Sequence, residues 1–184
     1  LKDVYYSGTE EKWNEITIDK VSNQYLANAT IHFSDGPTLN GPEGFEYKIL
    51  QDDTIEITKC TSSDEVIIIP ETIEGRPVVT LGFGAFLNNR DWREIHIPAS
   101  VTKVDDTNFM DCKLEGIYVD ESNANYLSEN GVLFHKDQTK LIKYPQGREG
   151  DYQIPCGTEI IANYAFEEAG GLTGVTIPSG VTTL

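Results

Sequence analysis

The sequence predicts a β-rich repeat solenoid built from short parallel strands, with β-hairpin insertions and little helix. Three observations predict it: a motif that recurs at a nearly fixed spacing, an alternation of apolar and polar residues within each copy, and two segments with the pattern of β-hairpins. Repeats have to be sought before single elements are assigned, because one unit is too small to bury its own apolar face.

The recurring motif is an apolar residue, any residue, a second apolar residue and proline, followed at a fixed distance by phenylalanine. Phe109 lies 11 residues after Pro98, and Phe166 lies 11 residues after Pro155. A further copy begins with GVTIP, whose Pro178 lies 23 residues after Pro155. A period of about 20–29 residues with one short strand per unit is typical of leucine-rich repeats.

Each copy contains a strand that alternates with period 2, so one of its faces points to the core. In REIHIP, for example, Ile95 and Ile97 point to one side and His96 points to the other. Proline cannot donate a ladder hydrogen bond, so it ends the strand and turns the chain. Stacking of neighbouring copies then buries the apolar faces.

One position of the repeat carries an aromatic side chain that is expected to form an internal spine: Phe86, Phe109 and Phe166. Alanine precedes the first and the last of these residues, whereas Asn108 precedes the second. We expect this departure to weaken the local register of the repeat near Phe109.

Two further segments have the alternation of β-hairpins. GVLFH and KLIKY, within residues 131–144, alternate on either side of the polar turn KDQT. Earlier in the chain, FEYKIL and TIEITK flank Gln51, Asp52 and Asp53. A hairpin at that place would cover the open core of the first repeat, as a solenoid cap does.

Charge and composition narrow the classes of function. The 14 Lys and Arg residues against 30 Asp and Glu residues give a net charge of −16, which argues against nucleic acid and anionic membranes as partners. The longest aliphatic run, residues 66–69, is far too short to insert into a membrane. With 39% apolar residues, the chain can bury a core.

No pattern indicates catalysis, a metal site or a cofactor. The histidines are isolated and no zinc-binding or nucleophile motif is present. Cys156 with His135 is a conceivable nucleophile pair, but Cys156 lies on a repeat turn where structural residues recur. Acidic pairs such as Asp105 and Asp106 lack the alternating spacing of a calcium loop. The cysteines are too widely spaced for a disulfide scaffold and are expected to be small buried hydrophobes: Cys60, Cys112 and Cys156.

These motifs resemble the BspA-like leucine-rich-repeat family of bacterial surface proteins. The resemblance runs over residues 44–184 and is carried by the I-P-x-x-V-T-x-I-x-x-x-A-F core, by NANYLSENGVLFHKDQTKLIKYP and by FEYKILQDDTIEITKC. It implies a non-catalytic module of a secreted or cell-surface protein that binds a protein partner, as in adhesion. The alternative is a glycan-binding or spacer module of a larger secreted enzyme, which would gather Trp13, Trp92 and tyrosines on one exposed patch.

The resemblance also divides the chain. Residues 1–34 look like the unit that closes a preceding repeat block, 35–44 are a Gly- and Pro-rich linker, and 45–184 start a second block with an N-terminal hairpin cap. In the first unit, residues 7–10 fit a capping box before a short helix that buries Trp13. Both ends of the chain fall within repeats, so we expect a piece of a longer protein whose strand edges favour end-to-end self-association.

The predicted partner-binding surface is the row of outward side chains on successive strands. Alternation places one such residue in each strand: Ile68, His96, Tyr118, Gln153 and Thr176. Directly stacked strands bring neighbours to about 4.7–4.9 Å, and repeat proteins hold extended partners on such faces. His96 and Tyr118 are amphipathic and suit an interface. The alternative interpretation is that all five are solvated strand residues.

Overall fold

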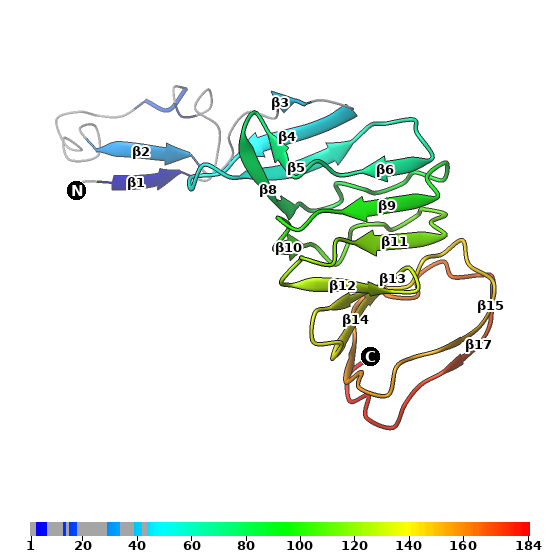
Figure 1. The fold of residues 1–184 in the computed structure, drawn as a ribbon. Coiled ribbons are helices and arrows are strands. Elements are labelled where there is room, and N and C mark those ends of the chain that lie inside the picture. Colours follow the sequence, from blue (N-terminus) through cyan, green and yellow to red (C-terminus); the bar gives the residue numbers. More distant parts are fainter. Residues whose placement is uncertain (1–2, 7–12, 14, 18–28, 34–38, 42–43) are drawn as a thin grey trace.

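The structure is a computed structural model of the 184-residue chain and describes residues 3–6, 13, 15–17, 29–33, 39–41 and 44–184. It confirms the predicted β-solenoid, and residues 44–184 contain no α-helix (Figure 1). The strands are β1 (Asp3–Tyr6), β2 (Thr30–Phe33), β3 (Leu39–Asn40), β4 (Phe45–Ile49), β5 (Ile55–Cys60), β6 (Val66–Ile68), β7 (Thr72–Ile73), β8 (Arg76–Leu81), β9 (Glu94–Ile97), β10 (Lys103–Val104), β11 (Gly116–Val119), β12 (Tyr126–Glu129), β13 (Val132–His135), β14 (Lys140–Lys143), β15 (Gly150–Gln153), β16 (Ile160–Ile161) and β17 (Leu172–Thr176).

A parallel sheet of β6, β9 and β11, here called the rung sheet, has the register that the repeat predicts. Ile67 pairs with Ile95, and Ile95 pairs with Ile117. All three side chains are buried, because every second residue of each strand faces the core. Stacking thus removes from water an apolar stripe that no single repeat could cover.

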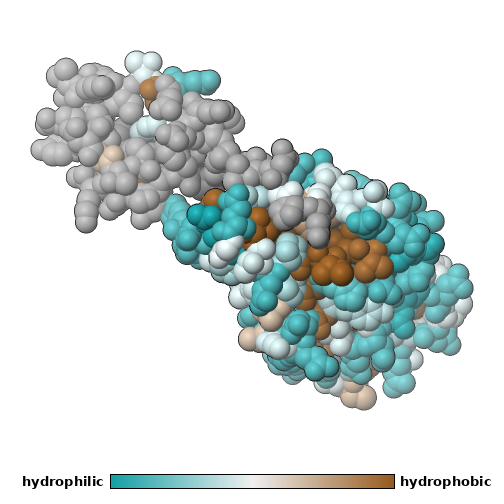
Figure 2. All heavy atoms as spheres, turned by 45° about the horizontal axis from the view of Figure 1, so that its top comes forward, coloured by the Kyte–Doolittle hydropathy of each residue, from teal (hydrophilic) through white to brown (hydrophobic). Residues whose placement is uncertain are grey.

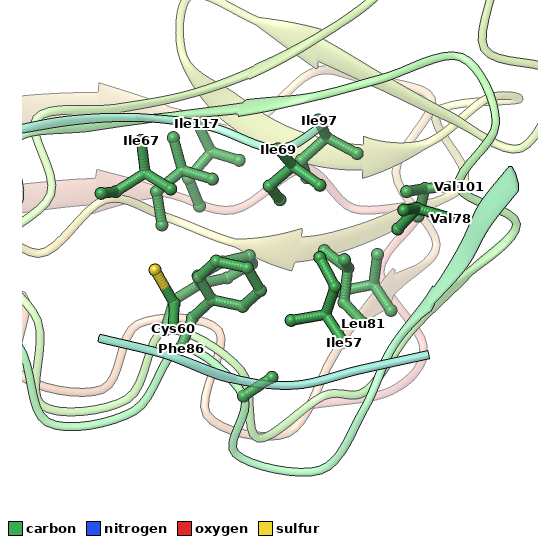
Figure 3. Close-up of a cluster of buried hydrophobic side chains, with 14 of the residues drawn as sticks. Ile57, Cys60, Ile67, Ile69, Val78, Leu81, Phe86, Ile97, Val101 and Ile117 are labelled. Atoms are coloured by element: carbon green, nitrogen blue, oxygen red, sulfur yellow. The ribbon is translucent and has the colours of Figure 1, made fainter. Parts of the chain in front are cut away.

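A second sheet, here called the rear sheet, has the strand order β10-β8-β5-β4-β3 and packs against the rung sheet. The chain passes from one sheet to the other at each turn, from β5 to β6, from β8 to β9 and from β10 to β11. Figure 3 shows the core between them, with Ile67, Ile97 and Ile117 facing Ile57 and Phe86. The rung residues are therefore held from behind by a continuous apolar layer.

The hairpin predicted around Gln51–Asp53 is present as the antiparallel pair β4 and β5. A hydrogen bond of 2.8 Å from the Leu50 amide to the Thr54 carbonyl closes its turn, where Asp53 has a left-handed φ of 62°. Phe45 of β4 and Ile57 of β5 are buried in the same core as the rungs. The hairpin therefore covers the end of that core that precedes the first rung.

A three-stranded antiparallel unit of β12, β13 and β14, here called the hairpin sheet, interrupts the stack of parallel strands and pairs onward with β16. It confirms the hairpin predicted within residues 131–144. Asn130 and Gly131 join β12 to β13 with φ of 50° and 76°, as a tight turn with positive φ at both centres requires.

The hairpin sheet is buried on both faces. Leu133 belongs to the core behind the rung sheet, whereas its neighbours Val132 and Phe134 belong to a second core on the C-terminal side. Successive side chains of a strand point to opposite faces, so one strand supplies both cores. The molecule therefore has two hydrophobic cores separated by this sheet.

The aromatic spine is continuous only in the first core. The ring centroids of Phe45 and Phe86 lie 6.3 Å apart, and those of Phe86 and Phe109 lie 5.7 Å apart. Phe166 belongs to the second core, where its ring stacks on Tyr144 at 5.3 Å. The expectation of one spine through all three phenylalanines was wrong, because the hairpin sheet separates their cores.

Asn108 stabilises the region that we expected it to weaken. Its side chain is buried, its Oδ1 accepts a hydrogen bond from the Phe86 amide at 3.2 Å, and its Nδ2 donates to the carbonyls of Leu81 and Gly82 at 3.1 and 3.0 Å. An alanine could make none of these bonds. The departure from the repeat therefore links one turn of the solenoid to the preceding turn.

Cys60 and Cys112 are buried as expected, whereas the expectation was wrong for Cys156, which is exposed on the turn after β15. All three cysteines are free. Burial raises the pKa of the Cys60 and Cys112 thiols to about 11, because a thiolate would lose its hydration.

Lys143 of β14 is also buried, although it is charged. Its ammonium donates a hydrogen bond of 2.9 Å to the Tyr164 carbonyl and lies 3.5 Å from the Glu167 carboxylate. Desolvation lowers the pKa of this lysine despite the nearby carboxylate. The side chain is buried because the hairpin sheet has no solvated face at this position, and its two polar partners accommodate the charge.

In the N-terminal part, β1 and β2 pair in parallel with Val4 opposite Ile31. The helix predicted after residues 7–10 lies largely outside the described residues, although Trp13 is half-buried. The division into a closing unit (1–34), a linker (35–44) and a second block (45–184) stays a prediction.

We expect Asn108→Ala to lower the free energy of unfolding by about 2–4 kcal/mol, because it removes three buried hydrogen bonds. This change restores the alanine of the other repeats, so a repeat consensus would predict the opposite sign. Urea denaturation of the variant measures the effect, with the exposed Asn163→Ala as the control. A variant as stable as the parent would contradict this role of Asn108.

The buried thiols predict a loss of stability at alkaline pH. Their folded pKa of about 11 exceeds the ordinary value of 9.0, so the unfolded chain ionises first. Their contribution is complete below pH 9 and is lost as pH rises to about 11, by up to about 2–3 kcal/mol per thiol. Urea denaturation of the Cys60→Ala and Cys112→Ala double variant should show a shallower pH dependence over this window; equal slopes would contradict the assignment.

Candidate functional site

The candidate site is the outer face of the rung sheet, where three of the predicted residues lie in one row. Ile68 pairs with His96, and His96 pairs with Tyr118, across β6, β9 and β11. The side chains are accessible, with Ile68 64% and Tyr118 38% exposed. The same register that buries the isoleucines on one face therefore aligns these residues on the other.

The rings of His96 and Tyr118 stack on each other. Their centroids lie 5.1 Å apart and their planes differ by 28°. The Oε2 atom of Glu94 lies 3.3 Å from the Nε2 atom of His96. The Glu94 carboxylate and the Tyr118 ring both contact the imidazole, and the stacked rings of His96 and Tyr118 form an amphipathic surface.

An open hollow of about 260 Å³ lies along this row. Its walls come from all three rungs and consist mainly of apolar and aromatic side chains, with the carboxylate of Asp120 beside the last rung. The lining residues are Ile68, Ile69, His96, Ile97, Pro98, Tyr118, Val119 and Asp120. The hollow fits an apolar side chain of a partner, with acceptors for a positive charge nearby.

The other two predicted residues lie apart from this row. Gln153 of β15 pairs with Thr176 of β17 in a separate parallel sheet. Both side chains are exposed. The hairpin sheet intervenes between β11 and β15, so the structure brings together two groups of the predicted residues and not one continuous row.

The structure does not bring together the Cys156 and His135 pair considered from the sequence. His135 packs edge-on against Tyr126 with ring centroids 5.6 Å apart, and within residues 44–184 no hydrogen bond joins it to Cys156. The described part of the chain also holds no group of three or more His, Cys, Asp or Glu residues arranged for a metal ion. In that part, no helix is long and apolar enough to cross a membrane.

Sequence reasoning missed Glu94, Pro98 and Asp120 as members of the site. Pro98 was interpreted as the residue that ends its rung, and Asp120 occupies the corresponding position of the next repeat. Because rungs end in register, these residues also line one side of the hollow. The recurrence of a strand-ending residue at a fixed distance from the outward residue is the signal that could have identified them.

Parallel strands stacked in register, an alternating apolar interior and an outward row of side chains define a leucine-rich-repeat solenoid. The chain belongs to the BspA-type leucine-rich-repeat family: the model of that family, described as "BspA type Leucine rich repeat region (6 copies)", matches residues 53–149 and 150–184. None of the curated proteins matches this chain in sequence.

The chain is similar to solved leucine-rich-repeat structures, and the first of them shares its fold. A leucine-rich repeat protein from Eubacterium ventriosum is 21% identical with a TM-score of 0.54, over 80% of this chain and 61% of that protein. A leucine-rich repeat protein from T. pallidum is 18% identical with a TM-score of 0.45, over 78% of this chain and 62% of that protein. A leucine-rich cell surface protein from Faecalibacterium prausnitzii is 16% identical with a TM-score of 0.36, over 82% and 73%. This chain thus spans about three-fifths of the first two proteins.

We expect Tyr118→Ala to move the His96 ring-proton resonances downfield, because the ring current of the stacked tyrosine is lost. The free energy of unfolding should fall by less than about 1 kcal/mol, since the side chain lies on the exposed face. Tyr164→Ala, at an exposed tyrosine on the turn after β16, is the control. Unchanged His96 resonances in the Tyr118 variant would show that the rings do not stack in solution.

Proposed function

We propose that this chain is a non-catalytic module that binds a protein partner through the outer face of its rung sheet. The observation that carries the proposal is the row of Ile68, His96 and Tyr118 along an open hollow. Leucine-rich repeats commonly use such faces to hold extended partners. Gln153 and Thr176 offer a second, smaller contact area on the sheet of β15 and β17.

The charge of the face favours a basic partner segment with an apolar anchor. Glu94 and Asp120 flank the hollow, and the chain as a whole carries a net charge of −16. An apolar side chain of the partner would enter between Ile68 and Tyr118, while neighbouring lysine or arginine residues would meet the carboxylates. Opposite charge would also speed the encounter.

The proposal includes a location outside the cell, either secreted or at the bacterial cell surface, and a role in adhesion. Membership in the BspA-type family supports this location, because the family that the sequence resembles consists of bacterial surface proteins. In the same proposal, residues 45–184 act as an interaction module that follows the closing unit of another repeat block.

The alternative, a glycan-binding or spacer module attached to a larger secreted enzyme, has less support. Sugar rings are bound by exposed aromatic side chains that lie together, but Trp92 is fully buried. Within residues 44–184, the two exposed tyrosines, Tyr118 and Tyr164, lie on different elements, in β11 and on the turn after β16. Phe83 is exposed as well, but it lies on the turn after β8; within residues 44–184, His96 and Tyr118 are the exposed rings that stack on each other.

The test compares the binding of a purified candidate partner to the parent chain and to the His96→Ala/Tyr118→Ala double variant by surface plasmon resonance. We expect binding to weaken at least about tenfold in this variant and to weaken with added salt. The Phe83→Ala/Tyr164→Ala double variant, which removes exposed aromatic residues from the turns after β8 and β16, is the matched control. Equal loss in both double variants, or none in the first, would refute the proposed face.

A further inference from the structure

Strand β6 is the outermost strand of the rung sheet, and the described residues place no strand on its free side. The rear sheet continues further, because β4 and β3 follow β5 in that sheet. Each of β5, β8 and β10 has a rung in front of it, namely β6, β9 and β11, but β4 has none. The rung sheet is therefore one strand shorter than the sheet behind it.

A hollow of about 190 Å³ occupies the place of the missing strand. Phe45 of β4 contributes to it from the rear sheet, and Val66, Ile67 and Ile68 contribute to it from β6. Ser62 and Asp64 complete its lining. Figure 2, which turns the upper end of the solenoid forward, shows hydrophobic side chains gathered at that end.

The backbone of β6 presents unpaired polar groups along this hollow. The Ile69 amide donates to the His96 carbonyl at 3.0 Å, and the Glu94 amide donates to the Glu65 carbonyl at 3.2 Å. The odd-numbered residues of this segment therefore direct their backbone hydrogen bonds to β9. In a parallel strand the intervening residues point the other way, so Val66 and Ile68 direct their N–H and C=O groups to the open edge.

The edge lacks the features that usually protect an unpaired strand. Val66 is 44% and Ile68 is 64% exposed, and β6 contains no lysine, proline or bulge. The charges beside it are negative, with Asp64 and Glu65 both exposed just before the strand. The adjacent Arg93 is already paired with Glu115.

We propose that the β6 edge binds an extended segment of a partner protein as an additional strand of the rung sheet. The segment alternates β-branched apolar residues with lysine or arginine. The apolar side chains fill the hollow beside the buried Phe45 and Ile67, and the basic side chains meet Asp64 and Glu65. The inference rests on the proposed function insofar as the ligand is a protein, but it uses backbone hydrogen bonds at an edge and not the stacked rings of the face.

The probe is the acetylated and amidated peptide Lys-Val-Lys-Val-Thr-Val-Lys, titrated into the full chain. We expect saturable binding in fluorescence anisotropy and slower amide hydrogen exchange at Val66 and Ile68. Val66→Pro removes one edge donor and should weaken binding about tenfold, whereas Val66→Thr keeps the donor and a similar shape and should bind nearly as the parent does. If Val66→Pro does not fold, a probe N-methylated at its valines replaces it, and the same loss is expected.

The His96→Ala/Tyr118→Ala double variant separates this inference from the proposed function. Peptide binding that survives in this variant and is lost in Val66→Pro supports strand addition. Binding lost only in the double variant overturns strand addition and leaves the face as the binding site. No binding of the peptide, or exchange protection at Val66 and Ile68 that rises with protein concentration alone, overturns the inference; the latter result would assign the edge to end-to-end association with a second copy.

Discussion

Each repeat of this chain has one apolar strand face that only a neighbouring repeat can cover, and the rest of the structure follows from this constraint. The parallel register of Ile67, Ile95 and Ile117 satisfies it. A shift of one residue would turn His96 into the core and expose the isoleucines, so the register is strongly determined. The outward row, and with it the candidate site, is thus fixed by packing on the opposite face of the same strands.

The parts of the fold that depend on local periodicity could be predicted from the sequence. The rungs and both hairpins follow from alternation with period 2 and from turn residues, and the structure has them at the predicted places. The burial of Lys143 and the bonds of Asn108 could not be predicted, because they depend on residues more than 20 positions away that meet only in the folded chain. The division of the core could not be predicted either, since alternation does not show whether the second face of a strand meets water or another core.

The candidate site, too, could be predicted only as far as it depends on local periodicity. Alternation identified Ile68, His96 and Tyr118 as outward residues, and register then placed them side by side. The hollow could not be predicted, because it depends on how the ends of three strands align in space. Gln153 and Thr176 were identified by the same alternation, but the intervening hairpin sheet puts them on another surface.

Ion pairs across the hairpin sheet contribute little to the union of its two sides. Arg90 reaches Glu168 across the sheet at 3.1 Å, and Lys140 of the sheet itself reaches Asp106 at 3.4 Å, but solvent-accessible pairs of this kind contribute about 0–1 kcal/mol. The two sides are held together mainly by burial of apolar side chains on both faces of the hairpin sheet. A different set of side chains covers each face. The side chains of the second core are therefore separate from those that support the rung sheet. A substitution in the second core should thus leave the stacked rings of His96 and Tyr118 in place, because their support lies on the other side of the hairpin sheet.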